Sequence, residues 1–324
     1  MEQIIVENVC KEFEISERQS GFINTIKNFV KRKKVIRKAV ENLNFTIHEG
    51  ELVAYIGANG AGKSTTIKML SGILTPTTGK IIVNGREPYR NRKENALEIG
   101  VVFGQRSQLF WDLPVMDAFE LYKKMYKISN DVYKKNLAQY MKLLGIDEFA
   151  KQPVRQLSLG QKMRAELCVA ILHNPRILYL DEPTIGLDVL VKSKIREFIK
   201  QINKEKHTTV ILTTHDMADI EAICNRVILI NKGKLIFDGK IEDFKNIYGA
   251  MTTVKIMFNS AMEYVDDDRF RLVLDEGKRK IYSFDRDKIT KAEAIKVFSK
   301  YNIEDIDMID AGIEEIVKQI YSED

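Results

Sequence analysis

The sequence predicts an α/β fold of the P-loop NTPase type, with a largely parallel sheet. Residues 57–65 match the pattern Gly-x4-Gly-Lys-Ser/Thr between an apolar run and a helical pattern. Residues 177–180 form a second, continuously apolar run, as is typical of a parallel strand buried on both faces. Asp181 and Glu182 follow that run directly, at the carboxyl end where open α/β sheets place their ligands. These observations together indicate a nucleotide-binding core.

The loop at residues 57–65 predicts that the chain binds a nucleoside triphosphate. Its glycines let the backbone curl, so that successive N–H groups and the N-terminus of the following helix point at the phosphates. We expect Lys63 to pair with the outer phosphates and Ser64 to ligate Mg²⁺. A glycine-rich surface turn is the alternative, but the flanking strand and helix patterns disfavour it. The predicted loop residues are Gly57, Ala58, Asn59, Gly60, Ala61, Gly62, Lys63, Ser64 and Thr65.

The acidic end of the second run supplies what hydrolysis needs besides a phosphate loop, namely carboxylates that hold the metal and orient water. We expect Asp181 to bind Mg²⁺ and Glu182 to polarise the attacking water. An Asp-Glu-Pro turn after a strand is the alternative interpretation. The presence of the loop at Lys63 in the same chain makes this alternative less favourable.

With these two motifs the chain resembles the ATPase subunits of ABC transporters, whose signature sequence falls shortly before the acidic strand. The signature positions here are Leu157, Ser158, Leu159, Gly160 and Gln161. The resemblance implies that Ser158 and nearby N–H groups contact the γ-phosphate of ATP held by the opposite subunit, so that two chains enclose two nucleotides. Leu159 departs from the family, which has glycine there, and it restricts φ. The segment also predicts that Ser158 caps a helix over residues 161–173.

The resemblance assigns four further residues. Gln105 matches the glutamine that senses metal and water, and it would join Ser64 and Asp181 as a Mg²⁺ ligand. Asp188 matches the loop that crosses the dimer interface, although it also suits a helix N-cap. His215 matches the switch histidine near the γ-phosphate, and Phe13 is the candidate for stacking on adenine. Taken alone, Gln105 and His215 would be incidental loop residues, and Phe13 could equally belong to the core.

The length of 324 residues predicts two domains. We assign residues 1–243 to an ABC ATPase core and residues 244–324 to a small C-terminal α/β accessory domain. The pattern becomes helical over residues 107–175, which matches the helical subdomain inserted in such ATPases. Residues 14–38 form a basic insertion, in which an apolar helical stripe lies beside seven lysines and arginines. That insertion suits either an anionic membrane surface or packing on the first sheet with solvated charges.

The composition indicates in which cellular compartment we expect the protein. Cys10, Cys168 and Cys224 are scattered, which argues against a disulfide framework and suits a reducing cytoplasm. The sequence has no apolar run of the roughly 20 residues needed to cross a bilayer, and no signal peptide. We therefore expect a cytoplasmic protein, peripheral on the inner face of the cell membrane, whose pore is another polypeptide. The net charge is +5, with a basic ATPase half and an acidic tail.

The leading functional hypothesis is an ATP-driven motor with ATP and Mg²⁺ as ligands. The insertion, Leu159 and the acidic tail look most like subunits paired with ABC-2 type export permeases. The expected partners are a second ATPase subunit, either an identical copy or a close paralogue, and a multi-span membrane permease, with no nucleic acid. Phe110 and Trp111 lie where similar subunits meet their permease, although Trp111 also suits a core position. The alternative is a soluble ABC-type ATPase that acts on ribosomes or nucleic acid.

Overall fold

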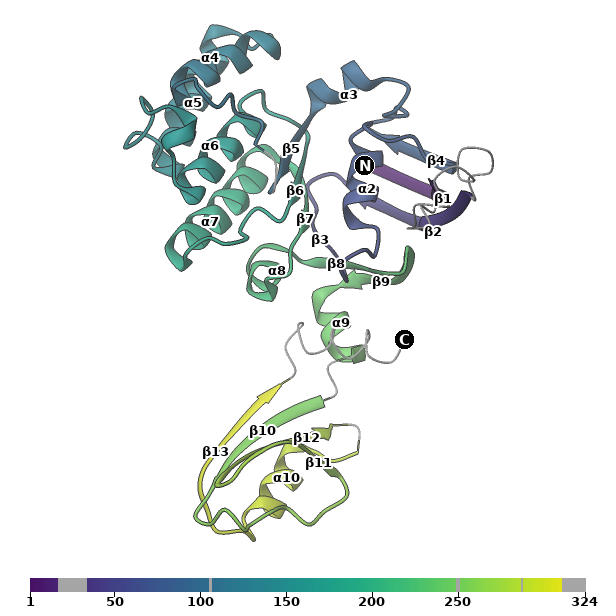
Figure 1. The fold of residues 1–324 in the computed structure, drawn as a ribbon, viewed down its shortest axis with the longest axis vertical. Helices are drawn as coiled ribbons and strands as arrows, with labels where there is room; N and C mark the ends of the chain where they lie inside the picture. The colour runs from purple at the N-terminus through teal and green to yellow at the C-terminus, as the bar shows by residue number, and fades with distance from the viewer. Residues whose placement is uncertain (17–33, 105–106, 249–250, 287, 311–324) are drawn as a thin grey trace, which may run out of the picture. The chain divides into compact units, whose positions relative to one another are not determined.

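The computed structural model describes residues 1–16, 34–104, 107–248, 251–286 and 288–310. The chain divides into two compact units, Met1–Asp238 and Gly239–Asp324 (Figure 1). The sequence places this boundary slightly later, after residue 243. The difference arises at helix α9 (Ile241–Tyr248), which a boundary at residue 243 would cut in two.

The first unit is built on a six-stranded sheet with the order β5-β6-β7-β3-β8-β9. The pairs β5–β6, β6–β7, β3–β7 and β3–β8 are all parallel, which confirms the parallel strand predicted from the apolar run at residues 177–180. Every residue from 177 to 180 in β6 is buried. The strands are β3 (Leu52–Gly57), β5 (Ile99–Phe103), β6 (Ile177–Asp181), β7 (Thr209–Thr213), β8 (Arg226–Asn231) and β9 (Lys234–Lys240).

A smaller antiparallel sheet with the order β2-β1-β4 completes the strand-rich part of this unit. Its strands are β1 (Glu2–Ser16), β2 (Lys34–His48) and β4 (Thr78–Val83). One buried apolar cluster joins this sheet, the larger sheet and helix α2 (Lys63–Leu70). The helix that follows the phosphate loop is therefore fixed on a continuous core.

The chain between β5 and β6 is mainly helical, and Figure 1 shows its helices grouped to one side of the larger sheet. Helix α6 is buried from Met163 to Ile171, and Cys168 within it is fully buried as a small core side chain. The described helices of the unit besides α2 are α3 (Arg92–Glu98), α4 (Val115–Met125), α5 (Asn130–Leu144), η1 (Val154–Gln156), α6 (Leu159–Ile171), α7 (Val189–Lys206) and α8 (Met217–Ile223).

The two ends of the predicted basic insertion, residues 14–38, are strands. Strand β1 continues to Ser16, which pairs with Lys34 at the start of β2. The β-branched pair Val35 and Ile36 suits this extended backbone. The apolar helical stripe predicted within the insertion lies outside the described residues.

The second unit contains a four-stranded antiparallel sheet with the order β11-β12-β10-β13. Helix α10 (Lys291–Phe298) contributes Ala294 and Phe298 to a core that it shares with the sheet. Thr290 and Glu293 cap this helix reciprocally. The strands are β10 (Met251–Phe258), β11 (Phe270–Glu276), β12 (Arg279–Asp285) and β13 (Ile303–Asp310).

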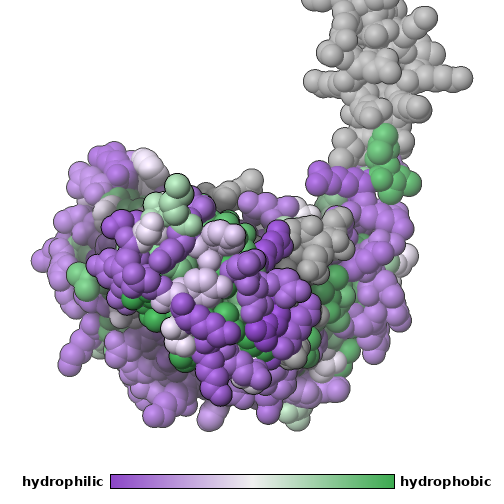
Figure 2. Space-filling model, turned by 90° about the horizontal axis from the view of Figure 1, so that it is seen from below, coloured by the Kyte–Doolittle hydropathy of each residue, from purple (hydrophilic) through white to green (hydrophobic). Residues whose placement is uncertain are grey.

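Figure 2 shows a face that is mostly hydrophilic, with limited green regions between the polar side chains. Across the described parts of the chain, no helix combines the length and the apolar character that a membrane span requires.

Candidate functional site

The predicted phosphate loop follows buried strand β3 and leads into helix α2. Gly57 and Gly62 are required by close backbone approaches, because a Cβ on them would lie 2.6 Å from the carbonyl oxygen of Ile230 and 2.5 Å from that of Ala39. Gly62 also has a φ of 109°, which side chains rarely adopt. Glycine at these two positions therefore lets the loop pack closely against β8 and β2.

Lys63 begins helix α2 and is almost fully buried. Its ammonium donates to the carbonyl oxygens of Gly57 at 2.6 Å and Ala58 at 3.2 Å. Burial lowers the pKa of Lys63, and the nearby carboxylates of Glu182 and Asp181 oppose that shift. The cation is thus held at the loop, on the side where the acidic residues lie.

The acidic end of strand β6 meets the phosphate loop. The hydroxyl of Ser64 donates to Asp181 Oδ2 at 3.0 Å, although the two residues are 117 positions apart. Thr213, at the end of neighbouring strand β7, donates to Asp181 Oδ1 at 2.5 Å. Ser64 and Asp181 are therefore in direct contact, and their role as ligands of one Mg²⁺ ion stays a prediction. The sequence analysis did not single out Thr213, whose signal is its place opposite Asp181 in the parallel register.

Glu182 and His215 also lie together. His215 Nε2 is 2.9 Å from Glu182 Oε1, and the backbone N–H of Glu182 donates to the carbonyl of Thr213. Glu182 has a φ of 57°, a left-handed conformation that is uncommon for a side chain of this size and is often found at functional sites. The structure thus places a carboxylate and an imidazole in contact at the edge of the phosphate loop.

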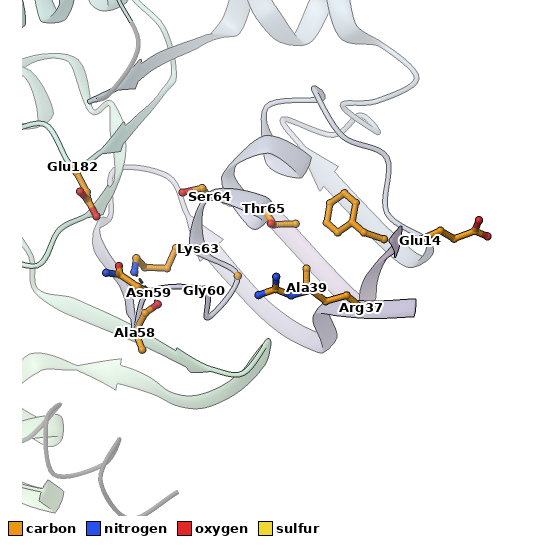
Figure 3. Close-up of a pocket in the computed structure, with 12 residues that line it drawn as sticks. Glu14, Arg37, Ala39, Ala58, Asn59, Gly60, Lys63, Ser64, Thr65 and Glu182 are labelled. Carbon is orange, nitrogen blue, oxygen red and sulfur yellow. Dashed lines mark hydrogen bonds between the residues drawn. The ribbon is translucent and has the colours of Figure 1, made fainter. Parts of the chain in front are cut away.

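A cavity of about 630 Å³ extends from Glu182 along the loop to the β1–β2 hairpin (Figure 3). Phe13 lines its far end, where it is 36% exposed, and the ammonium of Lys11 lies 5.2 Å from its ring centroid. The position suits the predicted contact with adenine, which stays a prediction. A smaller hollow of about 310 Å³, lined by Ser64, Lys68 and Asp181 among others, lies beside the same carboxylates.

Gln105 lies outside the described residues. The strand that leads to it, β5, runs beside β6, with Phe103 opposite Asp181. The N–H of Gly104 donates to the carbonyl oxygen of Asp181 at 2.8 Å, and a Cβ on Gly104 would lie 2.5 Å from the carbonyl oxygen of Glu182. The last described residue before Gln105 is therefore packed against the acidic strand end.

The signature residues do not line the cavity of their own chain. Ser158 and Gln161 form a reciprocal capping box at the start of α6, with bonds of 3.2 and 2.9 Å, which confirms the predicted N-cap. Leu157 precedes the cap, and Leu159 is 50% exposed. A Cβ on Gly160 would lie 3.3 Å from Val191, so little space remains there.

Asp188 caps helix α7 by accepting a bond from the N–H of Val191 at 2.9 Å. Exposed apolar side chains surround the start of this helix, with Val189 at 78% and Leu190 at 77% exposure. The N-cap role is therefore confirmed. The interface role of Asp188 stays a prediction, and the exposed apolar residues beside it are compatible with it.

The comparisons with known proteins agree with this geometry. The family model described as ABC transporter matches residues 40–185. The chain is 32% identical over 216 residues to the ABC transporter ATP-binding protein NatA of Bacillus subtilis, covering 67% of this chain and 87% of the relative. It is 33% identical over 224 residues to the linearmycin resistance ATP-binding protein LnrL of Bacillus subtilis, covering 69% and 71%.

A solved dimer of the ATP-binding cassette MJ0796, in a post-hydrolysis state bound to ADP and Pi, superimposes with a TM-score of 0.61. The two sequences are 28% identical, and the superposition covers 74% of this chain and 98% of the cassette. Family model, relatives and structure agree on one assignment. The chain belongs to the ATP-binding, ATP-hydrolysing subunits of ABC transporters.

Proposed function

We propose that this chain is one of two ATPase subunits that energise transport, in the export direction, through a separate membrane permease. The proposal depends on two contacts beside the phosphate loop. Ser64 contacts Asp181, and Glu182 contacts His215. The first pair offers a metal site and the second a site for activating water. The resemblance to subunits of ABC-2 type exporters supplies the direction.

The donor set fits Mg²⁺, which prefers oxygen ligands and usually keeps several waters. The hydroxyl of Ser64 and the carboxylate of Asp181 supply two such oxygens, and Gln105 is the expected third residue. Thr213 fixes the orientation of the carboxylate from the opposite side. Bound Mg²⁺ would neutralise charge on the outer phosphates of ATP.

Glu182 is the group that would polarise the attacking water. It stands next to Asp181 at the end of β6, and its carboxylate reaches His215 at 2.9 Å. The His215 side chain is 45% exposed, and its contact with Glu182 holds the carboxylate in one orientation. Lys63 and the loop N–H groups bind the phosphates, which separates binding from water activation.

The site requires a second cassette, either an identical copy or a close paralogue. Ser158 and Gly160, which the family uses to contact ATP, lie outside the cavity of their own chain. The apolar residues around these positions are exposed in the single chain, as expected of a surface that a partner covers. They are Leu159, Ile185, Val189 and Leu190.

The proposed permease contact lies at Phe110 and Trp111, which are 46% and 59% exposed. The ammonium of Lys162 lies 5.2 Å from the Trp111 ring, and the N–H of Arg155 donates to the carbonyl of Trp111 at 3.0 Å. Trp111 is thus contacted both by η1 and by α6, the helix that begins at the signature. Such a subunit would be cytoplasmic and peripheral on the inner face of the cell membrane, without nucleic acid as a partner.

Glu182→Gln tests the chemistry, because it keeps the shape of the side chain and removes the carboxylate. We expect hydrolysis to fall by about 10²–10⁴-fold, the usual contribution of a general base. Affinity for ATP, measured by equilibrium binding, should change much less. Equal losses of binding and hydrolysis would show that Glu182 serves the phosphates instead of the water.

Co-purification tests the transport assignment. The tagged protein, recovered from native membranes, should carry a multi-span membrane protein with it. Trp111→Ala should preserve ATP hydrolysis by the isolated subunit and lower the stimulation by that partner. Recovery with ribosomes or nucleic acid, and without a multi-span protein, would instead support the soluble ATPase alternative.

A further inference from the structure

The cavity above the phosphate loop continues onto the β1–β2 hairpin, where two facing side chains line it. Phe13 on β1 lies directly opposite Arg37 on β2 in the antiparallel register. Directly opposed residues project from the same face of the sheet, with Cβ atoms about 5 Å apart. An aromatic ring and a guanidinium therefore stand side by side at the end of the cavity away from Glu182.

The guanidinium of Arg37 points toward the phosphate loop. In Figure 3 its nitrogen atoms face Gly60, whereas the carboxylate of Glu14 points away from the loop. Arg37 Nη2 lies 3.9 Å from the position that a Cβ on Gly60 would occupy. Its neighbour Lys38 projects to the other face of the strand and pairs with Glu41 at 3.1 Å.

The guanidinium of Arg37 forms no ion pair or hydrogen bond with any of the residues that the structure describes. An unpaired cation beside loop N–H groups strengthens a site that already attracts anions. The guanidinium also presents donors in a planar fork that matches phosphate oxygens. The ligand that this arrangement fits is therefore a chain of phosphates that starts at the loop and leads toward Phe13.

We propose that Arg37 binds an inner phosphate of the nucleotide, on the side of the loop opposite Lys63. The proposal rests on the ATP site described above and adds a residue that the loop motif does not contain. Lys63 lies toward Glu182, where the outer phosphates belong, whereas Arg37 lies between Gly60 and Phe13. The contact is therefore common to ATP and ADP.

The test compares binding of ADP and of the non-hydrolysable ATP analogue AMP-PNP to the unmodified chain and to Arg37→Ala. We expect the dissociation constants of both nucleotides to rise by about tenfold, as for the loss of one charge-assisted hydrogen bond. Arg37→Lys should restore part of the affinity. Because Arg37 is exposed, the difference should shrink when salt is raised from about 0.05 to 0.5 M.

Inorganic triphosphate, which has neither ribose nor base, identifies the contacted group. Used as a competitor, it should bind Arg37→Ala about tenfold more weakly than the unmodified chain, because one charge-assisted bond is lost. Phe13→Ala should weaken nucleotide binding and leave competition by triphosphate unchanged. If Arg37→Ala weakens nucleotides but not triphosphate, the side chain contacts ribose or base and the phosphate assignment is wrong.

Lys38→Ala is the matched control, because it removes a neighbouring cation that does not line the cavity. It should leave all three dissociation constants unchanged, and unfolding followed by Trp111 fluorescence should show that every variant is folded. Unchanged nucleotide affinity in Arg37→Ala would overturn the proposal and leave the ATP site intact. Absence of nucleotide binding by the unmodified chain would instead contradict the ATP site itself.

Discussion

The buried carboxylate of Asp219 links the two loops that carry the candidate catalytic residues. It accepts a hydrogen bond from Arg196 Nε at 2.6 Å and another from Thr214 Oγ1 at 3.3 Å. The hydroxyl of Thr184 donates a third bond to the same carboxylate. Thr184 lies in the loop after β6 and Thr214 in the loop after β7. Asp219 therefore fixes both loops to helix α7, which carries Arg196.

Asp219→Ala should destabilise the first unit strongly. The substitution removes three hydrogen bonds to a carboxylate that is fully buried and leaves Arg196 with Asp216, 3.6 Å away, as its remaining acid. Breaking a buried ion pair costs about 3–5 kcal/mol, and we expect the free energy of unfolding to fall by that amount. Asp219→Asn keeps the shape of the side chain and one hydrogen-bond acceptor, so the free energy of unfolding should fall by about half as much.

Trp111 makes the measurement specific, because it is the chain's single tryptophan and lies in the first unit. Its fluorescence during urea titration reports the unfolding of that unit alone. Asp216→Asn is the control, since asparagine can still cap helix α8 and the lost pair with Lys192 is partly exposed. A loss in Asp219→Ala no larger than in this control would refute the reasoning.

Three further predictions concern the metal, the dimer and pH. Thr213→Val removes the donor that orients Asp181, so the Mg²⁺ concentration for half-maximal ATPase activity should rise several-fold, and Thr213→Ser should restore it. Mixed Lys63→Ala and Ser158→Arg subunits should form heterodimers with at most one competent site, and activity proportional to the first power of protein concentration would contradict a shared site. Burial lowers the pKa of His173 to about 4, so the unfolded chain binds more protons between pH 6.5 and 4 and stability falls with acidification through that range. In urea titrations, the free energy of unfolding of the unmodified chain should fall by about 2 kcal/mol more between pH 7 and pH 5 than that of His173→Phe.

The sequence predicted the parts of the site that depend on local pattern. The phosphate loop and the acidic strand end each follow a buried strand, and parallel strands bring such ends to one edge of a sheet. The contact between Ser64 and Asp181 follows from that geometry. Likewise, the capping box of Ser158 and Gln161 is a short-range property that the sequence carries directly.

The remaining contacts of the site could not be predicted from the sequence. Thr213 and Asp219 have no local pattern that separates them from other polar residues at strand and helix ends, because their partners come from distant elements. Pairing of β1 with β2 keeps residues as far as Ser16 and Lys34 in strands, and the apolar helical stripe between them stays a prediction.

Helix α6 connects the signature with the exposed surface at Trp111. Ser158, Lys162 and Glu166 follow one another at intervals of four, so they lie along one face of the helix start and its first turns. Ser158 caps the N-terminus, Lys162 lies over Trp111, and Glu166 accepts bonds from Ser107 and from the N–H of Gln108 at 2.9 Å.

These three contacts join the signature, the exposed aromatic surface and the segment that follows Gln105. A helix of 13 residues is a stiff rod of about 20 Å, and α6 is buried along most of its length, so it moves as one piece. We therefore expect a permease that contacts Trp111 to affect Ser158 through this helix. On this hypothesis Trp111→Ala should lower permease-stimulated hydrolysis, whereas the isolated subunit, whose acidic pair and phosphate loop lie on the sheet, should still hydrolyse ATP.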